Sequence, residues 1–334
     1  MLPDLSGLVI APLLRTFLLM LGATTGVWMR FESVAGDLFQ YRIRLEGVSL
    51  TLSKHLRCSA ESCVIECSLR DANLETLVIA QVILTGARFE YTHVSHEDVI
   101  PRDLPPFVIK HLVLHDSEVI FTDQTRGIPL TFSIRLAEYH CSQLHSRSLL
   151  FDALFTATAT GQLEKSPLTT RYQRSDTTCQ AQWAIRDLPV RRVSRFVKGQ
   201  LALLEQSTLD LLITPSWHVA EDALTLHVQV WIRDLVPVNP SPLLPAPSQR
   251  FNEALNQLLN PHLQSVPITF QLSVSRQDFL KLTRLDAFQI LLAFSEALSQ
   301  AILARSRQNY DQLVDMGRFG LNALLDLKQI FDKY

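Results

Sequence analysis

The chain has 334 residues, of which 47% are hydrophobic and only 19% are charged, and its formal net charge is −2. A charged share below the roughly 25% of soluble domains, with a mean hydropathy of +0.13, is unusual for a cytosolic enzyme. The near-neutral charge argues against a nucleic-acid-binding protein, which needs a basic stripe. Glycine is scarce, with 11 residues, and no phosphate-loop, nucleophile-elbow, H-E-x-x-H or C-x-x-C motif occurs. The sequence therefore predicts no enzyme, no catalytic residue, no cofactor and no metal site.

The N-terminal segment, residues 5–29, reads LSGLVIAPLLRTFLLMLGATTGVWM and contains a single charge, Arg15. About 25 residues in a helix are enough to cross the ~30 Å hydrocarbon layer of a membrane. We expect an uncleaved transmembrane helix in residues 1–30, with Arg15 reaching toward one interface. A cleaved signal peptide and a buried core helix are the alternatives. Either an anchor or a signal peptide would place the rest of the chain outside the cytoplasm.

From about residue 40 to residue 275, apolar and polar residues alternate with a period of two, which is typical of half-buried β-strands. The pattern is clearest in residues 130–136, 149–163, 224–233 and 268–274. Long strands with short connections favour an extended antiparallel sheet, which we place in residues 31–275. The apolar faces of three of these strands consist of Leu130, Phe132, Ile134 and Leu136; Leu224, Leu226, Val228, Val230 and Ile232; and Ile268, Phe270 and Leu272.

Faint repeats run through this region. Residues 43–52, 77–92 and 107–123 each show an apolar run, then a short predicted turn, then a second alternating run. Further along, residues 183–196 and 230–243 both contain I-R-D-L followed by proline. Repeats of this length indicate stacked units that bury their apolar faces together.

The Pro-rich stretch 236–247 is predicted to break the sheet, because proline cannot donate to a ladder of hydrogen bonds. A helix is predicted over 249–259. After residue 275 the period changes to 3.6, which predicts amphipathic helices in the C-terminal segment 276–334. One apolar stripe there includes Ser295, Leu298 and Ile302. These helices either pack on the sheet or on each other, or dock on a membrane surface or a partner helix.

Three of the five cysteines lie in residues 55–69, as Cys58, Cys63 and Cys67. Outside the cytoplasm, oxidising conditions favour a disulfide over zinc thiolates. Cys58 and Cys63 bracket the sequence SAES, which suits a four-residue hairpin loop, and they are the predicted disulfide. Inert buried thiols, or a metal site that includes His55, are the alternatives.

Other polar residues are weaker candidates. His111 and His115 are predicted on one strand face, ~13 Å apart, which is too far for one metal ion. Residues 93–98, HVSHED, are predicted to form a solvated loop, with a metal site as the alternative. Asp116 and Asp123 are expected to flank a turn. The cluster Arg191, Arg192 and Arg195 fits a solvated face or a lipid headgroup site.

The order of these segments resembles the AsmA-like superfamily, particularly its DUF748 branch, which is related to bacterial bridge-like lipid transfer proteins. The resemblance rests on RFESVAGDLFQYRIRLEGVSLTL after the apolar N-terminus, then LPPFVIKHLVLHDSEVIFTD, IRDLPVRRVSRFV, LHVQVWIRDLVPVNP and a closing VPITFQLSVSRQDF. It covers most of residues 5–300, and its motifs are degenerate patterns. The chain departs from the family in being short and in lacking the glycines expected at several strand starts.

The resemblance implies an anchor in the bacterial inner membrane and a body in the periplasm. It also implies a curved, taco-like sheet whose apolar concave face binds or moves phospholipid or another acyl lipid, in support of envelope homeostasis. The apolar strand residues given above are the candidate groove, since each buried CH₂ contributes roughly 0.8 kcal/mol. The same residues would also fit a plain core. The alternative functions are a structural or accessory subunit of a membrane protein complex, and a hydrolase with an unrecognised site.

Overall fold

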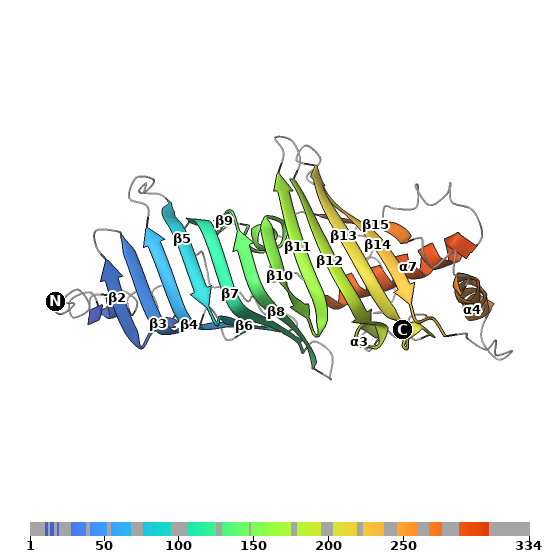
Figure 1. Cartoon of the computed structure of the whole chain (residues 1–334), viewed down its shortest axis with the longest axis horizontal. Helices are drawn as coiled ribbons and strands as arrows, with labels where there is room; N and C mark the ends of the chain where they lie inside the picture. The colour runs from blue at the N-terminus through green and yellow to red at the C-terminus, as the bar shows by residue number, and fades with distance from the viewer. Residues whose placement is uncertain are drawn as a thin grey trace. The chain divides into compact units, whose positions relative to one another are not determined.

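The elements of the computed structural model belong to two units, which we describe separately (Figure 1). Unit 1 comprises residues 1–164, 169–171 and 279–284, and unit 2 comprises residues 165–168, 172–278 and 285–334. The structure describes residues 11–12, 14–16, 19, 28–37, 41–51, 55–67, 76–94, 106–124, 129–146, 148–174, 179–194, 203–218, 223–236, 246–259, 267–275 and 287–306.

Unit 1 is built on a large mixed sheet with the strand order β1-β3-β4-β5-β7-β8-β10, in which β2 pairs with β3, β6 pairs with β4 and β7, and β9 pairs with β7. Most pairs are antiparallel. However, β5 and β6 both run parallel to β7, so the expectation of a wholly antiparallel sheet is wrong here. β7 begins beside the start of β5, with Phe107 paired with Leu77, so the two strands run in the same direction. The bounds are β1 (Trp28–Arg30), β2 (Ser33–Asp37), β3 (Arg42–Thr51), β4 (Leu56–Cys67), β5 (Leu77–Thr85), β6 (Arg88–His93), β7 (Phe107–Asp123), β8 (Leu130–Cys141), β9 (Leu144–His145) and β10 (Ala157–Leu163).

A row of four residues crosses unit 1 where the sequence predicts turns, and we call this row the crease: Gly47, Glu61, Gly86 and Asp116. The pairing register sets Gly47 opposite Glu61, Glu61 opposite Gly86 and Gly86 beside Asp116. Three of them have left-handed backbones, with φ of 60° at both glycines and 47° at Asp116. The predicted turns are therefore wrong, because β3 and β7 continue through the crease and β6 follows β5 almost directly.

The crease moves the alternation of side chains by one residue, so that one face stays apolar on both sides of it. In β3 the buried residues are Leu45 and Val48, three positions apart instead of two. In β7 the same step separates Leu114 from Ser117. The face that collects the apolar clusters of unit 1 is called the inner face below. Its buried members include Phe31, Leu45, Val48, Ala60, Cys63, Val82, Ala87, Leu114, Leu136, Tyr139, Cys141, Leu144, Ala157 and Ala159.

The strand predicted over 149–163 is only half right. Residues Leu149–Phe155 form helix α2, and β10 begins at Ala157. Helical bonds close this segment, with Asp152 N donating to Ser148 O and Thr156 N donating to Asp152 O. The Ser148 hydroxyl also donates to the Asp152 carboxylate. These local bonds override the alternating pattern of the sequence.

Unit 2 carries the strands β11 (Ser166–Arg174), β12 (Cys179–Pro189), β13 (Thr208–His218), β14 (Ala223–Arg233) and β15 (Ile268–Ser275), in that order. The pairs from β12 to β15 are antiparallel. Its helices are α3 (Val190–Ser194), α4 (Ala246–Leu258) and α7 (Ala287–Ser306). Helix α7 packs on β15, and α4 packs on α7. The helix predicted over 249–259 corresponds to α4, and α7 carries the predicted apolar stripe; residues 307–334 lie outside the described part.

The two I-R-D-L repeats occupy equivalent places at the ends of β12 and β14. Their aspartates, Asp187 and Asp234, both have positive φ, at 54° and 56°. Arg233 donates to the carboxylates of Asp187 and Asp210, which tie β14 to β12 and β13. The Thr208 hydroxyl donates to Asp234 at 2.7 Å. Each repeat thus marks the point where a strand of unit 2 ends.

The expected membrane anchor lies largely outside the described residues. Within the part of the chain that the structure describes, no helix is both long and apolar enough to cross a membrane. Trp28, Met29 and Arg30 form β1 and pair with β3, so the end of the anchor predicted in residues 1–30 belongs to the sheet instead. The Arg15 guanidinium lies 5.2 Å from the centre of the Phe31 ring and holds this part of the segment close to the sheet.

Candidate functional site

The inner face of unit 1 between the crease and the far end of β6, β7 and β8 is the main candidate site. Residues directly opposite each other in a sheet present their side chains on the same face. The pairing register therefore places side chains in three rows. The first row is Cys58, Phe89, Val119, Ile134 and Leu163; the second is Leu56, Tyr91, Phe121 and Phe132; the third is His93 and Asp123.

The first two rows are apolar or aromatic, and much of their surface is only partly buried. Phe132 and Ile134, both predicted groove residues, have intermediate exposure, whereas Leu136 is 6% exposed. Only the backbone of Leu130 is described. Other half-buried apolar residues pack around the same clusters, namely Ile43, Ile65, Ile79, Leu84, Phe89, Ile109, Leu112 and Val119. A continuous apolar surface with this exposure can take up further apolar groups.

The third row gives this apolar face a polar end. Asp123 is 3% exposed, His93 9% and Tyr91 7%. The Tyr91 hydroxyl lies 3.4 Å from His93 Nδ1, and the Tyr91 ring packs on Phe121 with centroids 5.4 Å apart. Burial, with a contribution from the charge of Asp123, raises the pKa of Tyr91 to about 12. The arrangement is amphipathic, as an amphiphilic ligand requires.

The predicted groove residues of unit 2 lie in a closed core. Phe270 of β15 contacts Phe294 of α7, with ring centroids 5.6 Å apart. Leu226 and Phe270 are partly buried. The remaining members are almost fully covered, with exposures of 1% at Leu224, 2% at Val228, 0% at Val230, 5% at Ile232, 4% at Ile268 and 7% at Leu272. In this state they have no surface to offer a ligand.

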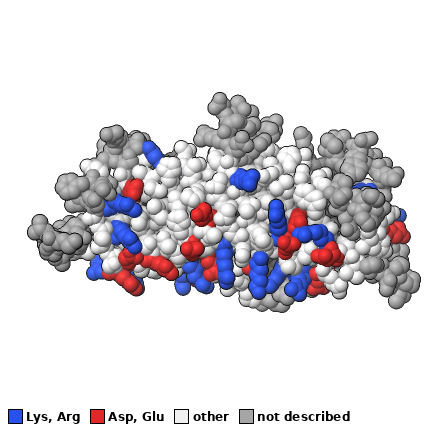
Figure 2. Space-filling model, in the orientation of Figure 1, with Lys and Arg blue, Asp and Glu red and all other residues white. Residues whose placement is uncertain are grey.

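The opposite, outer face of unit 1 is mixed: it carries charged pairs, but also Val64, Ile83 and Val113, of which Val64 and Val113 are buried. Arg88 pairs with Glu90 and with Glu118, and Arg135 also approaches Glu118 at 3.6 Å. On the face shown in Figure 2, basic and acidic side chains are interspersed instead of forming one large patch of either sign. These exposed pairs contribute little to stability individually.

The predicted hairpin at Cys58 and Cys63 is wrong. Both residues lie in the single strand β4, and both are free thiols. Residues five positions apart in an extended strand are about 16 Å apart, whereas a disulfide needs Cα atoms within ~7 Å. Burial raises the pKa of Cys58 to about 12 and that of Cys63 to about 11, which makes them unreactive.

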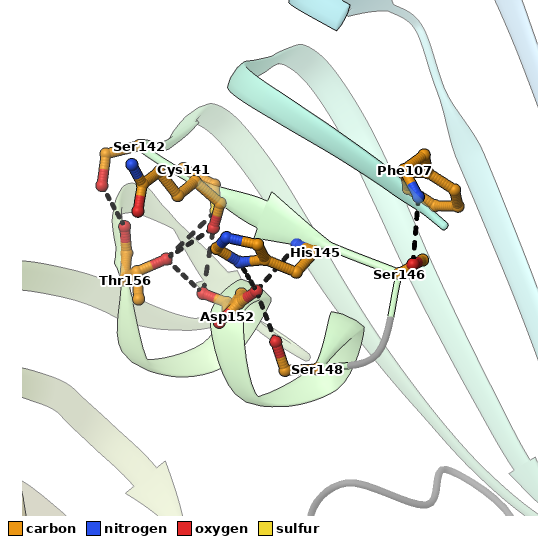
Figure 3. Close-up of polar contacts among 9 residues, drawn as sticks. Phe107, Cys141, Ser142, His145, Ser146, Ser148, Asp152 and Thr156 are labelled. Atoms are coloured by element: carbon orange, nitrogen blue, oxygen red, sulfur yellow. Dashed lines mark hydrogen bonds and ion pairs between the residues drawn. The ribbon is translucent and has the colours of Figure 1, made fainter. Parts of the chain in front are cut away.

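A polar cluster around α2 was not found by sequence reasoning (Figure 3). One oxygen of Asp152 accepts hydrogen bonds from the His145 backbone N–H, from His145 Nδ1 and from the Ser148 hydroxyl, each at 2.8 Å. The serine bonds the carboxylate and not the histidine, which is not the order of a nucleophilic triad. Cys141 is 2% exposed and burial raises its pKa. The cluster fastens β9 to α2, and its sequence signal is the S-x-x-x-D spacing at 148–152.

The other polar candidates do not assemble into a site. His111 and His115 both lie on β7, and His115 packs edge-on against His140 of β8. Asp116 and Asp123 also lie within β7, so the turn expected between them is wrong. Among the described residues no group of three histidine, cysteine or acidic side chains could hold a metal ion. His96, Glu97, Asp98 and Arg195 lie outside the described residues, while Arg191 and Arg192 belong to α3.

No family model matches this chain, and no curated protein matches it either. The inner face of unit 1 is therefore the main structural evidence on function.

Proposed function

We propose that this protein is a membrane-anchored, AsmA-like protein of the bacterial inner membrane, whose body lies in the periplasm and binds phospholipid or another acyl lipid. One observation carries the proposal: the inner face of unit 1 is a continuous apolar surface that stays partly exposed on both sides of the crease. The apolar segment 5–27 supports the membrane location, and the resemblance of the sequence supports the lipid.

The dimensions of the face suit an acyl chain. The first row crosses five strands, from Cys58 in β4 to Leu163 in β10. At ~4.8 Å between strands the row is about 19 Å long, which is the length scale of an extended acyl chain. Each buried CH₂ contributes roughly 0.8 kcal/mol, from which the cost of ordering the chain is subtracted. Several rows side by side hold more than one chain.

We place the headgroup at the end of the apolar rows, beside the polar third row, whose own side chains are at most 9% exposed. Tyr91 and His93 bring a hydroxyl and an imidazole to the end of the apolar rows, and Asp123 adds a carboxylate. A lipid whose acyl chains lie along the first two rows, across the strands, then has its polar atoms beside the third row. This orientation avoids placing a polar group on the apolar surface, which is costly when no hydrogen bond replaces water.

The test compares two substitutions on neighbouring residues of β8. Phe132→Glu places a charge on the second row, whereas Thr131→Glu places it on the outer face, where residue 131 is exposed. Full-length protein is purified in detergent, and bound phosphorus per protein is measured. We expect Phe132→Glu to lose most of the lipid and Thr131→Glu to keep it. Equal lipid in both variants, or none in the wild type, contradicts the proposal.

The second candidate function is a structural or accessory subunit of a membrane protein complex. The observation in its favour is unit 2, where most of the predicted groove residues are buried. Purification with mild detergent distinguishes the two functions. A stoichiometric protein partner without bound phospholipid supports the subunit, and bound phospholipid without a partner supports the lipid-binding protein.

A further inference from the structure

The last strand of the unit 2 sheet has one side that no strand occupies. β15 pairs with β14 along its whole length, from Ile268 to Ser275, without a shift in register. Within the described part of the chain, no strand pairs with the other side of β15. A strand in an antiparallel sheet directs its N–H and C=O groups alternately to either side, so about half of those of β15 point away from β14. We call this side the free edge.

The free edge lacks the features by which proteins protect an exposed strand. Protected edges are short, bulged, or carry proline or charged side chains, above all lysine. The sequence of β15 is ITFQLSVS, which contains neither proline nor a charged residue. Thr269 and Gln271 are exposed, and Phe270 stays partly exposed although it contacts Phe294 of α7. An edge of this kind is a template for pairing with another strand.

The edge of the unit 1 sheet is built differently. There it is divided into β1 and β2, of three and five residues. Arg30 and Asp37 add charges to these strands, and the Arg15 guanidinium donates to the carbonyl oxygen of Glu32 at 3.3 Å. A head-to-tail array of copies would need both edges to accept a strand. The contrast therefore favours a contact that uses β15 alone.

We propose that the free edge is an interaction surface for the β15 strand of a second copy of this chain, paired antiparallel across a two-fold axis. Such a contact uses the same patch on both copies. Directly opposite residues share a face of the sheet, so a register centred on Gln271 sets Gln271 against itself and Phe270 against Leu272 of the second copy. Apolar residues then meet apolar residues, and no like charges meet, because β15 is uncharged.

The second copy fits beyond β15 itself, because the strand next to the edge also suits self-pairing. β14 contains no Asp, Glu, Lys or Arg before Arg233, its last residue. Two copies joined at the free edge therefore bring four successive strands together with almost no charge, and the two unit 2 sheets become one. The proposal goes beyond the lipid-binding function and does not depend on it.

The oligomeric state of the full-length protein in detergent tests the proposal, measured by size-exclusion chromatography with light scattering over a range of concentrations. Gln271→Lys places two ammonium groups directly opposite each other at the axis, where like charges are destabilising. His227→Lys is the matched control, because His227 is exposed and lies opposite Gln271 on β14, one strand from the edge. We expect dimers for the wild type and His227→Lys, and a dissociation constant at least tenfold higher for Gln271→Lys.

Charge complementation tests the register. Gln271→Glu alone should also weaken the dimer, whereas an equimolar mixture of Gln271→Lys and Gln271→Glu should restore it. Hydrogen exchange of the wild type needs no variant: alternate amides of β15 should exchange at least tenfold faster after dilution to monomer.

Three kinds of result overturn the proposal. The first is a wild type that is monomeric, or that forms oligomers which keep growing with concentration. The second is a dimer that neither Gln271 variant weakens, or that Gln271→Lys and His227→Lys weaken equally, or a mixture that stays monomeric. The third is a different protein that copurifies in a stoichiometric amount and protects β15, which would assign the free edge to that protein.

Discussion

The side chain of Glu61 lies directly over Gly86. A Cβ atom on Gly86 would come within 2.6 Å of Glu61 Cδ, and a Cβ on Gly47 would come within 2.5 Å of Glu32 Cδ in the same way. Both glycines have φ of 60°, which side chains rarely adopt. Each glycine of the crease is thus covered by a glutamate, Gly86 by Glu61 and Gly47 by Glu32, which lies outside the crease.

Replacing a crease glycine should destabilise the fold. We expect Gly86→Ala to lower the free energy of unfolding by about 1–3 kcal/mol, because alanine at positive φ is strained and its Cβ displaces Glu61. Gly36→Ala in β2 is the control, since Gly36 is not among the positive-φ residues. Urea unfolding measures both. Equal effects of the two substitutions would mean that the crease is not strained.

At Asp116 the reverse substitution, to glycine, can be made. This residue has a left-handed backbone, with φ of 47°, although it is not a glycine. The residue is exposed, so little burial is lost on substitution. We expect Asp116→Gly to be neutral or to stabilise by up to about 1 kcal/mol, and Asp116→Val to destabilise by about 1–2 kcal/mol. Thermal unfolding of the two variants ranks them. Asp116→Val unfolding at a higher temperature than Asp116→Gly would be inconsistent with this backbone.

The buried thiols make a prediction about reactivity. In native protein at pH 8, iodoacetamide should label the exposed Cys67 and leave Cys58 and Cys63 free but unlabelled until denaturant is added. Mass mapping without reductant reads all three positions. A Cys58–Cys63 disulfide in this experiment would require a β4 different from the one described here.

The raised pKa of Cys58 should lower the free energy of unfolding at alkaline pH. The pKa of Cys58 is about 12 in the folded chain against an ordinary value of 9.0, so between these values the unfolded chain loses its proton first. Stability is unaffected below pH 9 and then falls by at most ~1.4 kcal/mol per pH unit for this group. Denaturant unfolding from pH 8 to 11 should show a shallower decline for Cys58→Ala than for the wild type. Parallel declines would mean that the thiol is not perturbed.

Asp152 is predicted to be a structural hub. Asp152→Ala leaves the His145 N–H and the Ser148 hydroxyl without their acceptor, and we expect a loss of about 2–4 kcal/mol. Ser148→Ala removes one of the three bonds and should cost about 1 kcal/mol. Guanidinium unfolding compares the two variants. A smaller loss for Asp152→Ala than for Ser148→Ala would contradict the role of the carboxylate as the common acceptor.

The sequence was informative wherever a strand keeps one face apolar. The period of two correctly indicates the strands at 130–136, 224–233 and 268–274, and the period of 3.6 indicates α4 and α7. The period of two failed to predict the structure where one residue shifts the alternation of side chains by one position. At Gly47, Gly86 and Asp116 the alternation is interrupted by a glycine or an aspartate. A left-handed residue within a strand and a hairpin turn both produce this pattern, so the sequence alone predicts a turn.

The candidate site was harder to predict than the strands. Phe132 and Val228 are both apolar members of alternating strands, yet one is partly exposed and the other is 2% exposed. Phe270, the partner of Val228 in β15, contacts Phe294 of α7, and such a contact joins strands to a helix later in the chain that no local pattern indicates. The placement of Asp123 beside His93, next to Tyr91, also depends on the parallel pairing of β6 and β7, which no local pattern indicates.

The central claim is that acyl lipid lies on the inner face of unit 1, and photolabelling measures this most directly. A phospholipid carrying a diazirine in its acyl chain is incorporated during purification of the full chain, activated by light and mapped by mass spectrometry. We predict adducts on inner-face residues of β6, β7 and β8, such as Phe89, Val119 and Ile134, with none on the outer-face residues Arg88, Glu118 and Arg135. Adducts confined to residues 5–27, or spread equally over both faces of the sheet, would contradict the account.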